Sequence, residues 1–344
     1  MKAVFITEHG NIDKLQYGDL KEPEISSKEV LIKLKAACLN HLDIWVRTGI
    51  LGIKVTFPHI LGSDGAGIVD KIGSEVKNIN VGDKVLLNPG ISCNTCESCI
   101  SGEHSQCSTF HLLGEHVNGT YAEFVKAPFE NVYPIPGNLS FEESAAFPLV
   151  FLTAWRMLVT KAKLLPGETI LILGIGGGVS SAALQIAKQI GARVFVTSGE
   201  KRKLEKAKEL GSDYGINYNE TDFVKEVRKL TEKRGVDVVL DNVGAATWTK
   251  SLACLAKGGR IVTCGATTGS DPQTDIQRIF WNQITVFGST MGNRKEFSQV
   301  LNLFKVNKLE PTIDSVFPLR DFKDAQKKME EKEQFGKIII KISE

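Results

Sequence analysis

An apolar strand, a cluster of glycines and a helix follow one another without a break near the middle of the chain. The apolar run TILIL covers residues 169–173, and the helical stretch ends at Gly191. The turn between them carries the residues that we assign to a coenzyme pyrophosphate: Gly174, Gly176, Gly177, Gly178 and Val179. Glycines permit the tight turn and let backbone N–H groups approach a phosphate, which the helix dipole also attracts. The segment therefore predicts a dinucleotide-binding turn rather than a flexible glycine loop.

Apolar strands alternate with helical segments from about residue 150 onward. The strands are expected at TILIL, RVFVTS (193–198), YGINY (214–218), VDVVLDNVG (236–244), RIVTCG (260–265) and ITVFGST (284–290). Such alternation indicates βαβ units, whose strands form a parallel, doubly wound sheet. The sequence thus predicts an α/β nucleotide-binding domain over residues 150–287.

The first 149 residues have a different pattern, in which short alternating runs are broken by Gly and Pro. Examples are EVLIKLKAA (29–37), AGIVDKIG (66–73), DKVLLNPG (83–90) and YAEFVKA (121–127). This pattern is typical of antiparallel strands. The segment GKIIIKI (336–342) is a further strand, and we expect residues 288–344 to return to the β-rich domain formed by residues 1–149.

Length and composition exclude several classes of protein. A chain of 344 residues is more than one core usually holds, so two domains are expected. The formal net charge of +2 gives no indication of nucleic-acid binding. No apolar stretch approaches the roughly 18 residues that suggest a membrane span, and the N-terminus resembles a strand more than a signal peptide. We therefore expect a cytoplasmic protein that contacts neither membranes nor nucleic acids.

Four cysteines lie close together in the β-rich part of the chain. Cys93, Cys96, Cys99 and Cys107 form the pattern C-x2-C-x2-C-x7-C, and their neighbours are mostly polar. Four thiolates with this spacing can surround one zinc ion and leave no open position, which is typical of a structural site. An iron–sulfur cluster also uses four cysteines, but its common bacterial motif has a shorter last spacing followed by Pro. The pattern favours zinc, and a cluster or a metal-free lobe remains an alternative.

The end of the second parallel strand predicts which coenzyme binds. An acidic residue there would accept hydrogen bonds from the ribose 2′-hydroxyl of NAD, but Ser198 occupies the expected position. Arg202 and Lys203 follow closely and suit a 2′-phosphate, so NADPH is favoured over NADH. Glu200 is the contrary observation, because it can take the acidic role if the strand ends later. Further residues assigned to the coenzyme site are Tyr218, Asn242 and Cys264.

The glycine turn, the cysteine lobe and the two-domain layout together resemble the medium-chain dehydrogenase/reductase superfamily. Its members include zinc alcohol dehydrogenases and quinone oxidoreductases. Matching stretches include KEVLIKLKAA, LGSDGAGIV, VGDKV, GTYAEFV, GGRIVTCG and GKIIIKI. The resemblance implies a GroES-like catalytic domain, a Rossmann nucleotide-binding domain, and a homodimer or homotetramer joined through the edge of the nucleotide-domain sheet.

The resemblance also identifies the positions at which alcohol-oxidising members hold a catalytic zinc. Cys38 matches the first ligand of these members. Ser63 and Asp64 replace the His-Glu pair, and an apolar residue near Leu149 replaces the second Cys ligand. One of three usual protein ligands remains, whereas a catalytic zinc needs three and a water. A second metal held by Cys38 with His41, His59 or Asp64 stays an open alternative.

Loss of the catalytic zinc favours a different reaction. An alcohol must be deprotonated by a metal or an equivalent charge before hydride can leave, whereas reduction of a conjugated C=C delocalises charge into the carbonyl. The segment LNHLDIWVRTG also resembles the zinc-free quinone and enone reductases, which carry Asn and Asp at the places of Asn40 and Asp43. We expect Asn40 to orient the substrate or the nicotinamide, Asp43 to fix the cleft, and Thr153 to contact the nicotinamide end. The alternative for Asn40 and Asp43 is a pair of turn or cap residues. The alternatives are an alcohol or aldehyde dehydrogenase with an atypical metal at Cys38, and a scaffold without activity.

Overall fold

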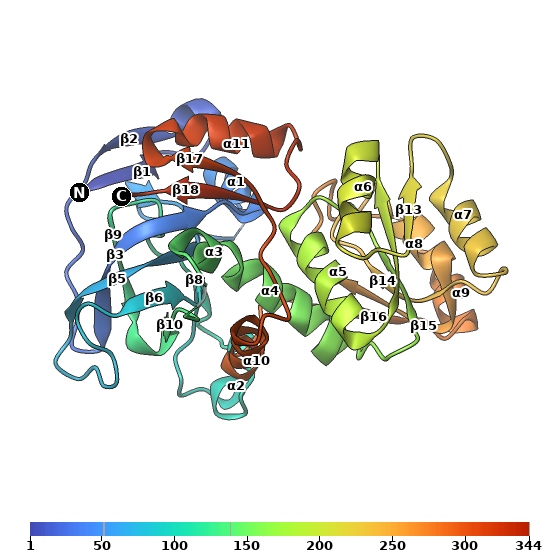
Figure 1. Ribbon diagram of the computed structural model, residues 1–344, viewed down its shortest axis with the longest axis horizontal. Helices are drawn as coiled ribbons and strands as arrows, with labels where there is room; N and C mark the ends of the chain where they lie inside the picture. Colours follow the sequence, from blue (N-terminus) through green and yellow to red (C-terminus); the bar gives the residue numbers. More distant parts are fainter. Residues whose placement is uncertain (51, 138, 344) are drawn as a thin grey trace. The chain divides into compact units, whose positions relative to one another are not determined.

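The computed structural model describes residues 1–50, 52–137 and 139–343 and divides into two compact units (Figure 1). The first unit comprises Met1–Leu149 and Gly292–Glu344, and the second comprises Val150–Met291. The second segment of the first unit begins at Gly292 in the structure, four residues after the boundary expected from the sequence at residue 288.

The first unit is built on a mostly antiparallel sheet with the strand order β10-β6-β5-β3-β18-β17, in which only the pair β17 and β18 runs parallel among the described residues, and β9 also pairs with β3. Alternate residues of β3 bury Val30, Ile32 and Leu34 in one core, as the alternating sequence predicts. A smaller sheet has the order β2-β1-β4, and β7 pairs with β8. The strands are β1 Lys2–Ile6, β2 Gln16–Asp19, β3 Glu29–Cys38, β4 His59–Ile60, β5 Asp64–Ile72, β6 Lys84–Leu87, β7 Gly90–Ile91, β8 His111–Leu112, β9 Phe124–Pro128, β10 Val132–Pro134, β17 Ile313–Pro318 and β18 Lys337–Lys341.

Short helices connect these strands. The helices of the first unit are α1 His41–Thr48, α2 Glu97–Ile100, α3 Phe141–Ala146, α10 Arg294–Lys305 and α11 Phe322–Glu330, with 3₁₀ turns at Ile12–Lys14, His104–Gln106, Phe129–Asn131 and Leu319–Asp321. The C-terminal strand β18 runs antiparallel to β3, with Ile339 opposite Cys38. This pairing brings residues near both ends of the chain to the same part of the sheet.

The second unit contains a parallel sheet with the order β13-β12-β11-β14-β15-β16, which confirms the predicted doubly wound fold. Its strands are β11 Thr169–Ile172, β12 Arg193–Ser198, β13 Tyr214–Asn217, β14 Val236–Leu240, β15 Leu255–Thr263 and β16 Thr285–Gly288. Its helices are α5 Gly178–Ile190, α6 Lys201–Glu209, α7 Phe223–Leu230, α8 Trp248–Cys254 and α9 Ile276–Trp281, while α4 Pro148–Trp155 and a π-helix at Arg156–Lys161 precede β11. The strand order changes direction at β11, so right-handed crossovers place α5 and α6 on the opposite face from α7 and α8.

One strand begins earlier than the sequence predicts. The segment LAKGG after α8 looks like the end of a helix, but β15 already begins at Leu255. Leu255 pairs with Val236 and is buried in the apolar core of the second unit, and the ladder then shifts register before it resumes at Arg260. Burial of one leucine therefore extends the strand beyond a Lys-Gly-Gly segment that periodicity alone assigns to the helix end.

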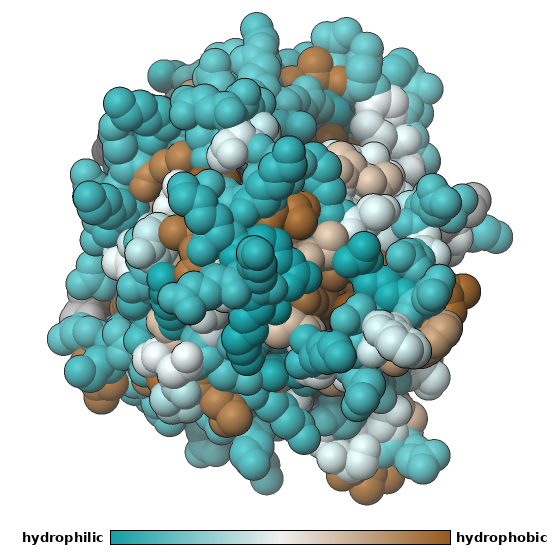
Figure 2. Space-filling view, turned by 90° about the vertical axis from the view of Figure 1, so that its right-hand side faces the viewer, coloured by the Kyte–Doolittle hydropathy of each residue, from teal (hydrophilic) through white to brown (hydrophobic). Residues whose placement is uncertain are grey.

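The face drawn in Figure 2 is largely hydrophilic, with hydrophobic residues in small separate areas. No helix within the described residues is both long enough and apolar enough to cross a membrane.

Candidate functional site

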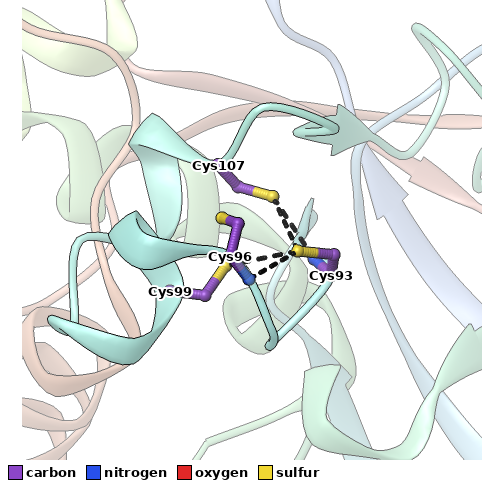
Figure 3. Close-up of side chains that lie close together, drawn as sticks. All are labelled: Cys93, Cys96, Cys99 and Cys107. Atoms are coloured by element: carbon purple, nitrogen blue, oxygen red, sulfur yellow. Dashed lines mark hydrogen bonds between the residues drawn. The ribbon is translucent and has the colours of Figure 1, made fainter.

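The cysteine lobe brings four thiols together (Figure 3). The Sγ atoms of Cys93, Cys96, Cys99 and Cys107 all lie within 4.8 Å of one another. The Sγ of Cys93 is 3.5 Å from that of Cys107 and 3.9 Å from that of Cys99. A tetrahedral zinc with Zn–S bonds of about 2.3 Å requires S–S separations of about 3.8 Å. The four sulfurs therefore fit one zinc ion without a change in the backbone.

Hydrogen bonds to the cysteine sulfurs also favour metal binding by this lobe. The backbone N–H of Cys96 donates to the Sγ of Cys93 at 3.3 Å, and the N–H of Cys93 approaches the Sγ of Cys107 at 3.4 Å. Such donors stabilise thiolates, which are the form that binds zinc. Among residues 1–50, 52–137 and 139–343, this is the one group of three or more Cys, His, Asp or Glu side chains that can hold a metal ion.

The glycine turn of the second unit has the conformation that a phosphate-binding turn needs. Gly174 and Gly176 have φ values of +62° and +133°, which L side chains rarely adopt. The N–H of Ile175 donates to the carbonyl of Thr197 at 2.8 Å, and this bond ties the turn to β12. Helix α5 begins at Gly178, and no side chain in the described part of the chain caps its N-terminus. Its first amides thus remain available for an anion.

Ser180 occupies the position where a helix-packing glycine is often found in this motif. Its side chain is fully buried, and its hydroxyl donates to the carbonyl of Leu173 at 2.9 Å. The hydroxyl is therefore satisfied inside the close contact of α5 with β11, which explains why serine is tolerated there.

The end of β12 holds a polar cluster. Ser198 is buried, and its Oγ accepts the backbone N–H of Glu200 at 3.1 Å. Glu200 is paired with Lys203 at 2.5 Å and with Arg202 at 3.5 Å. Tyr218 is exposed and follows β13, the strand that pairs with β12. The residues predicted to recognise the ribose thus lie together, with Glu200 bound to both predicted cations.

The remaining predicted coenzyme residues follow other strands of the same sheet. Asn242 comes after β14 and Cys264 after β15, and both are partly buried. Parallel neighbouring strands end at one edge of a sheet, so both residues share that edge with the glycine turn. Thr153 lies in α4, is buried, and its Oγ1 is 3.7 Å from the Sδ of Met291.

Cys38 lies at the end of β3 and, among the described residues, belongs to no group of three or more side chains that could hold a metal ion. Its side chain is fully buried, and its Sγ donates to the carbonyl of Ile338 at 3.2 Å. Burial raises the pKa of the Cys38 thiol to about 12, so the thiol remains protonated at neutral pH. Ser63 donates its hydroxyl to the carbonyl of Leu113 at 2.8 Å. At the position matched to the family's second Cys ligand, Leu149 has an apolar side chain that cannot bind a metal.

Asp64 is instead bound by hydrogen-bond donors. Its Oδ1 accepts the backbone N–H of Leu149 at 2.9 Å, and its Oδ2 accepts the Asn40 side-chain amide at 2.8 Å. The ammonium of Lys337 lies 3.5 Å from the same Oδ2, 2.5 Å from Asn40 Oδ1 and 2.8 Å from the carbonyl of Leu39. Burial raises the pKa of the Asp64 carboxyl, whereas the Lys337 ammonium and the Asn40 amide lower it.

Asp43 belongs to the same buried region. Its Oδ2 accepts the Tyr121 hydroxyl at 2.5 Å and the backbone N–H of Asn40 at 2.8 Å, which fixes the first turn of α1. Burial raises the pKa of Asp43 to about 7, although both hydrogen bonds act in the opposite direction. We call Asn40, Asp43, Asp64, Tyr121 and Lys337 the buried polar network. The hydrogen-bonding groups of Asn40 and Asp43 thus have protein partners, and the two residues form the cap of α1, as their alternative reading expects. A role of Asn40 in orienting the substrate or the nicotinamide stays a prediction.

The two histidines weighed as alternative ligands are also engaged elsewhere. The Nε2 of His59 is 3.1 Å from the carbonyl of Gly114, and the His41 ring packs edge-on against Trp45 at 5.0 Å between centroids. Burial lowers the pKa of both imidazoles. Neither forms a metal-binding group with Cys38 within the described residues.

Sequence reasoning missed Lys337 and Tyr121. Both act across long stretches of chain, since Lys337 reaches Asp64 and Asn40 from β18. The one local signal was a lysine at the start of the apolar run KIII, where a charged residue must find a partner if the strand is central.

Two family models match the chain. The model described as alcohol dehydrogenase GroES-like domain matches residues 26–137, and the model described as zinc-binding dehydrogenase matches residues 178–306. The first match covers most of the antiparallel sheet, and the second covers most of the parallel sheet. These matches agree with the fold class predicted from the sequence.

Full-length relatives show the same layout. A crystal structure of an NAD-dependent alcohol dehydrogenase is 44% identical, with a TM-score of 0.96 and 100% of both chains covered. The zinc-type alcohol dehydrogenase-like protein of Schizosaccharomyces pombe is 33% identical over 350 residues, which cover 99% of each chain. The crotonyl-CoA carboxylase/reductase of Cereibacter sphaeroides is 31% identical over 361 residues, covering 95% of this chain and 83% of the relative.

Proposed function

Because the chain belongs to the medium-chain dehydrogenase/reductase superfamily, we propose that it transfers hydride from NADPH to an α,β-unsaturated carbonyl compound or a quinone, without a catalytic metal. The chain is an oxidoreductase, like the dehydrogenases and reductases it matches. We also propose that Cys93, Cys96, Cys99 and Cys107 hold one structural zinc. The conjugated substrate and the choice of NADPH are the finer parts of the proposal.

One observation carries the proposed reaction class. At the positions matched to the family's catalytic ligands, the Cys38 thiol donates to a carbonyl and Leu149 offers no ligand atom. Ser63 is bound to Leu113. Without a Lewis acid, an alcohol keeps its proton and resists hydride removal, whereas an enone spreads negative charge into its carbonyl. This difference supports reduction of a conjugated carbonyl over oxidation of an alcohol.

The residues of the chain divide into those that bind the coenzyme and those that hold the site rigid. When bound, NADPH supplies a hydride that adds to the β-carbon of the substrate. The glycine turn and the first amides of α5 bind its pyrophosphate, and Thr153 contacts the nicotinamide end. Asn40 and Asp43 are positioning residues, because their bonds to Asp64, Lys337 and Tyr121 fix the start of α1. The α-carbon then takes its proton from solvent.

Alcohol oxidation is the second candidate, because relatives at up to 44% identity include NAD-dependent alcohol dehydrogenases. It requires a metal at Cys38 with His41, His59 or Asp64. In the structure the His41 ring packs against Trp45, and His59 Nε2 lies at hydrogen-bond distance from the Gly114 carbonyl. Asp64 belongs to the buried polar network, so metal binding would have to displace several of these contacts.

A comparison of two reactions tests the proposal. The purified protein is given NADPH with an enone or a quinone, and separately NADP⁺ with primary and secondary alcohols, each with and without a brief EDTA treatment. We expect EDTA-insensitive reduction of the conjugated carbonyl. We expect kcat/KM for alcohols to be at least about a hundredfold lower, since a Lewis acid supplies several kcal/mol to alcohol activation. Rapid alcohol oxidation abolished by EDTA would instead establish the second candidate.

The coenzyme preference rests on the end of β12. Ser198 supplies no carboxylate for a ribose 2′-hydroxyl, and Arg202 and Lys203 lie within the next turn of chain. Tyr218 follows the neighbouring strand β13, and its ring packs closely against Gly199. These features support binding of a 2′-phosphate, which two cations can contact.

Ser198→Asp is expected to reverse this preference. The new carboxylate would repel a 2′-phosphate and accept hydrogen bonds from a 2′-hydroxyl, so the Kd for NADPH should rise at least about tenfold while that for NADH falls. Fluorescence titration of both coenzymes measures the change. Ser198→Asn is the matched control, because it has a similar size without the charge and should weaken NADPH binding much less. Equal affinity of the unaltered protein for both coenzymes would contradict the NADPH assignment.

Assembly into a homodimer or homotetramer remains a proposal. Strand β16 forms an outer edge of the parallel sheet. Exposed apolar side chains lie on it and on α9 just before it, at Ile276, Phe280, Trp281 and Val286. An exposed strand edge beside apolar side chains supports pairing with a second copy of the chain.

A further inference from the structure

The predicted ribose pocket contains an ion cluster made by Glu200, Arg202 and Lys203. Glu200 Oε1 lies 2.5 Å from the Lys203 ammonium, and Glu200 Oε2 lies 3.5 Å from Arg202 Nη2. The side chain of Lys203 is 8% exposed, whereas those of Glu200 and Arg202 are 47% and 50% exposed. Lysine is thus the fixed member of the cluster and glutamate the accessible one.

The backbone that carries Glu200 is held in place. The Glu200 N–H donates to Ser198 Oγ at 3.1 Å, and the amide of Asn219 donates to the carbonyl of Gly199 at 3.0 Å. A Cβ at Gly199 would lie 2.8 Å from the Tyr218 ring, so this strand end is packed closely against the next one. Glu200 can therefore leave the cluster by a change in its side chain while its backbone stays in place.

We propose that the Glu200 carboxylate occupies the cation pair that the 2′-phosphate of NADPH takes when it binds, so that Glu200 sets how strongly NADPH is preferred over NADH. The inference rests on the proposed function, because it assumes that the 2′-phosphate lies at the end of β12. A phosphate and a carboxylate cannot both stay beside one ammonium without repulsion. NADPH must therefore displace Glu200 from Lys203, whereas NADH leaves the ion pair intact.

The alternative is that Glu200 itself receives the ribose hydroxyls of NADH. The geometry favours displacement, because each carboxylate oxygen already faces a cation and the bond to Lys203 would have to be shared. The two ideas predict opposite effects when the charge of Glu200 is removed.

The substitution Glu200→Gln distinguishes the two ideas by coenzyme affinity, without a measurement of activity. The Kd values of NADPH and NADH are measured by titration calorimetry, each at low and high salt. We expect NADPH to bind roughly threefold to fivefold more tightly, which is the upper end of the scale for one partly exposed ion pair, and NADH to change less than about twofold. The gain for NADPH should shrink at high salt, because the salt screens the ion pair that the unaltered protein must break.

Glu205→Gln is the matched control. It removes the same charge from an exposed residue of the same helix, and it lies outside the ion cluster. We expect both Kd values to stay within about twofold of those of the unaltered protein. Circular dichroism spectra of both variants check that the fold is kept.

Four results would overturn the inference. Weaker NADH binding by Glu200→Gln would show that Glu200 receives the ribose. An equal gain in NADPH affinity for Glu205→Gln would show that the effect comes from net charge alone. An unchanged NADPH affinity of Glu200→Gln would exclude displacement while leaving the proposed function intact. If neither the unaltered protein nor Glu200→Gln bound NADPH, both the inference and the proposed use of NADPH would fail.

Discussion

Lys337→Met is expected to lower the free energy of unfolding by about 3–5 kcal/mol, because it leaves the Asp64 carboxylate buried without its cation. Lys337 is 3% exposed and Asp64 is fully buried, so water cannot replace the lost ammonium. The substitution also removes the donor to the carbonyl of Leu39 and to Asn40 Oδ1. Urea unfolding at pH 7, followed by circular dichroism, measures the loss.

A second lysine in the same strand gives a matched control. Lys341 lies at the other end of β18 and is exposed, so Lys341→Met should change the free energy of unfolding by less than about 0.5 kcal/mol. The difference between the two variants isolates the contribution of the buried position from that of strand propensity.

A double-mutant cycle then tests the pairing itself. Asp64→Asn removes the negative charge and keeps an acceptor and a similar size. If the two charges stabilise each other, Lys337→Met with Asp64→Asn should be about 1–3 kcal/mol more stable than the sum of the single effects indicates. Strictly additive effects would contradict this reading, because they would mean that Asp64 does not need Lys337 as a counter-ion.

The two lysines also show where sequence reasoning ends. Both flank the run Ile338–Ile340, and nothing local distinguishes the buried one from the exposed one. The distinction arises because β18 pairs with β3 and places Lys337 near Asp64, a residue 273 positions earlier in the chain. Such contacts depend on strand register, which a single sequence does not specify.

Local sequence patterns predicted the secondary structure better than they predicted such long-range contacts. The alternation of strands and helices was sufficient to predict the parallel sheet, because apolar periodicity depends on neighbouring residues. It failed at Leu255, where burial against β14 overrides a segment that looks like a helix end. The spacing of the four cysteines indicated one cluster, and the sulfurs do lie together, although zinc itself stays a prediction.

For Asn40 and Asp43 the sequence singled out the residues but did not predict their hydrogen-bond partners. The sequence suggested that Asn40 orients the substrate or the nicotinamide and that Asp43 fixes the cleft. The structure places both inside the buried polar network, where Tyr121, Asp64 and Lys337 use their hydrogen-bonding capacity. A motif can therefore single out a group of polar residues while leaving open whether they touch the substrate or support the residues around it.

Cys96→Ser is expected to release the metal from the lobe. The unaltered protein should contain one zinc per chain, and the variant should lose most of it, because three thiolates leave a position open to water. Cys96 is the N-cap of α2, and serine is a favoured N-cap residue, so the local backbone should tolerate the change. We expect the melting temperature to fall by roughly 5–10 °C, since structural zinc contributes directly to folding.

Elemental analysis of dialysed protein and differential scanning calorimetry measure these two effects. Cys254→Ser is the control, because it removes a buried thiol from α8 in the second unit and should leave the zinc content at one per chain. Full zinc retention by Cys96→Ser would refute the assignment of the lobe. Two zinc ions per unaltered chain would point to a second metal in the first unit, and Cys38→Ser would then show whether the buried thiol is its ligand. In that event alcohol oxidation would become the favoured reaction, because the missing Lewis acid is the reason for preferring a conjugated carbonyl.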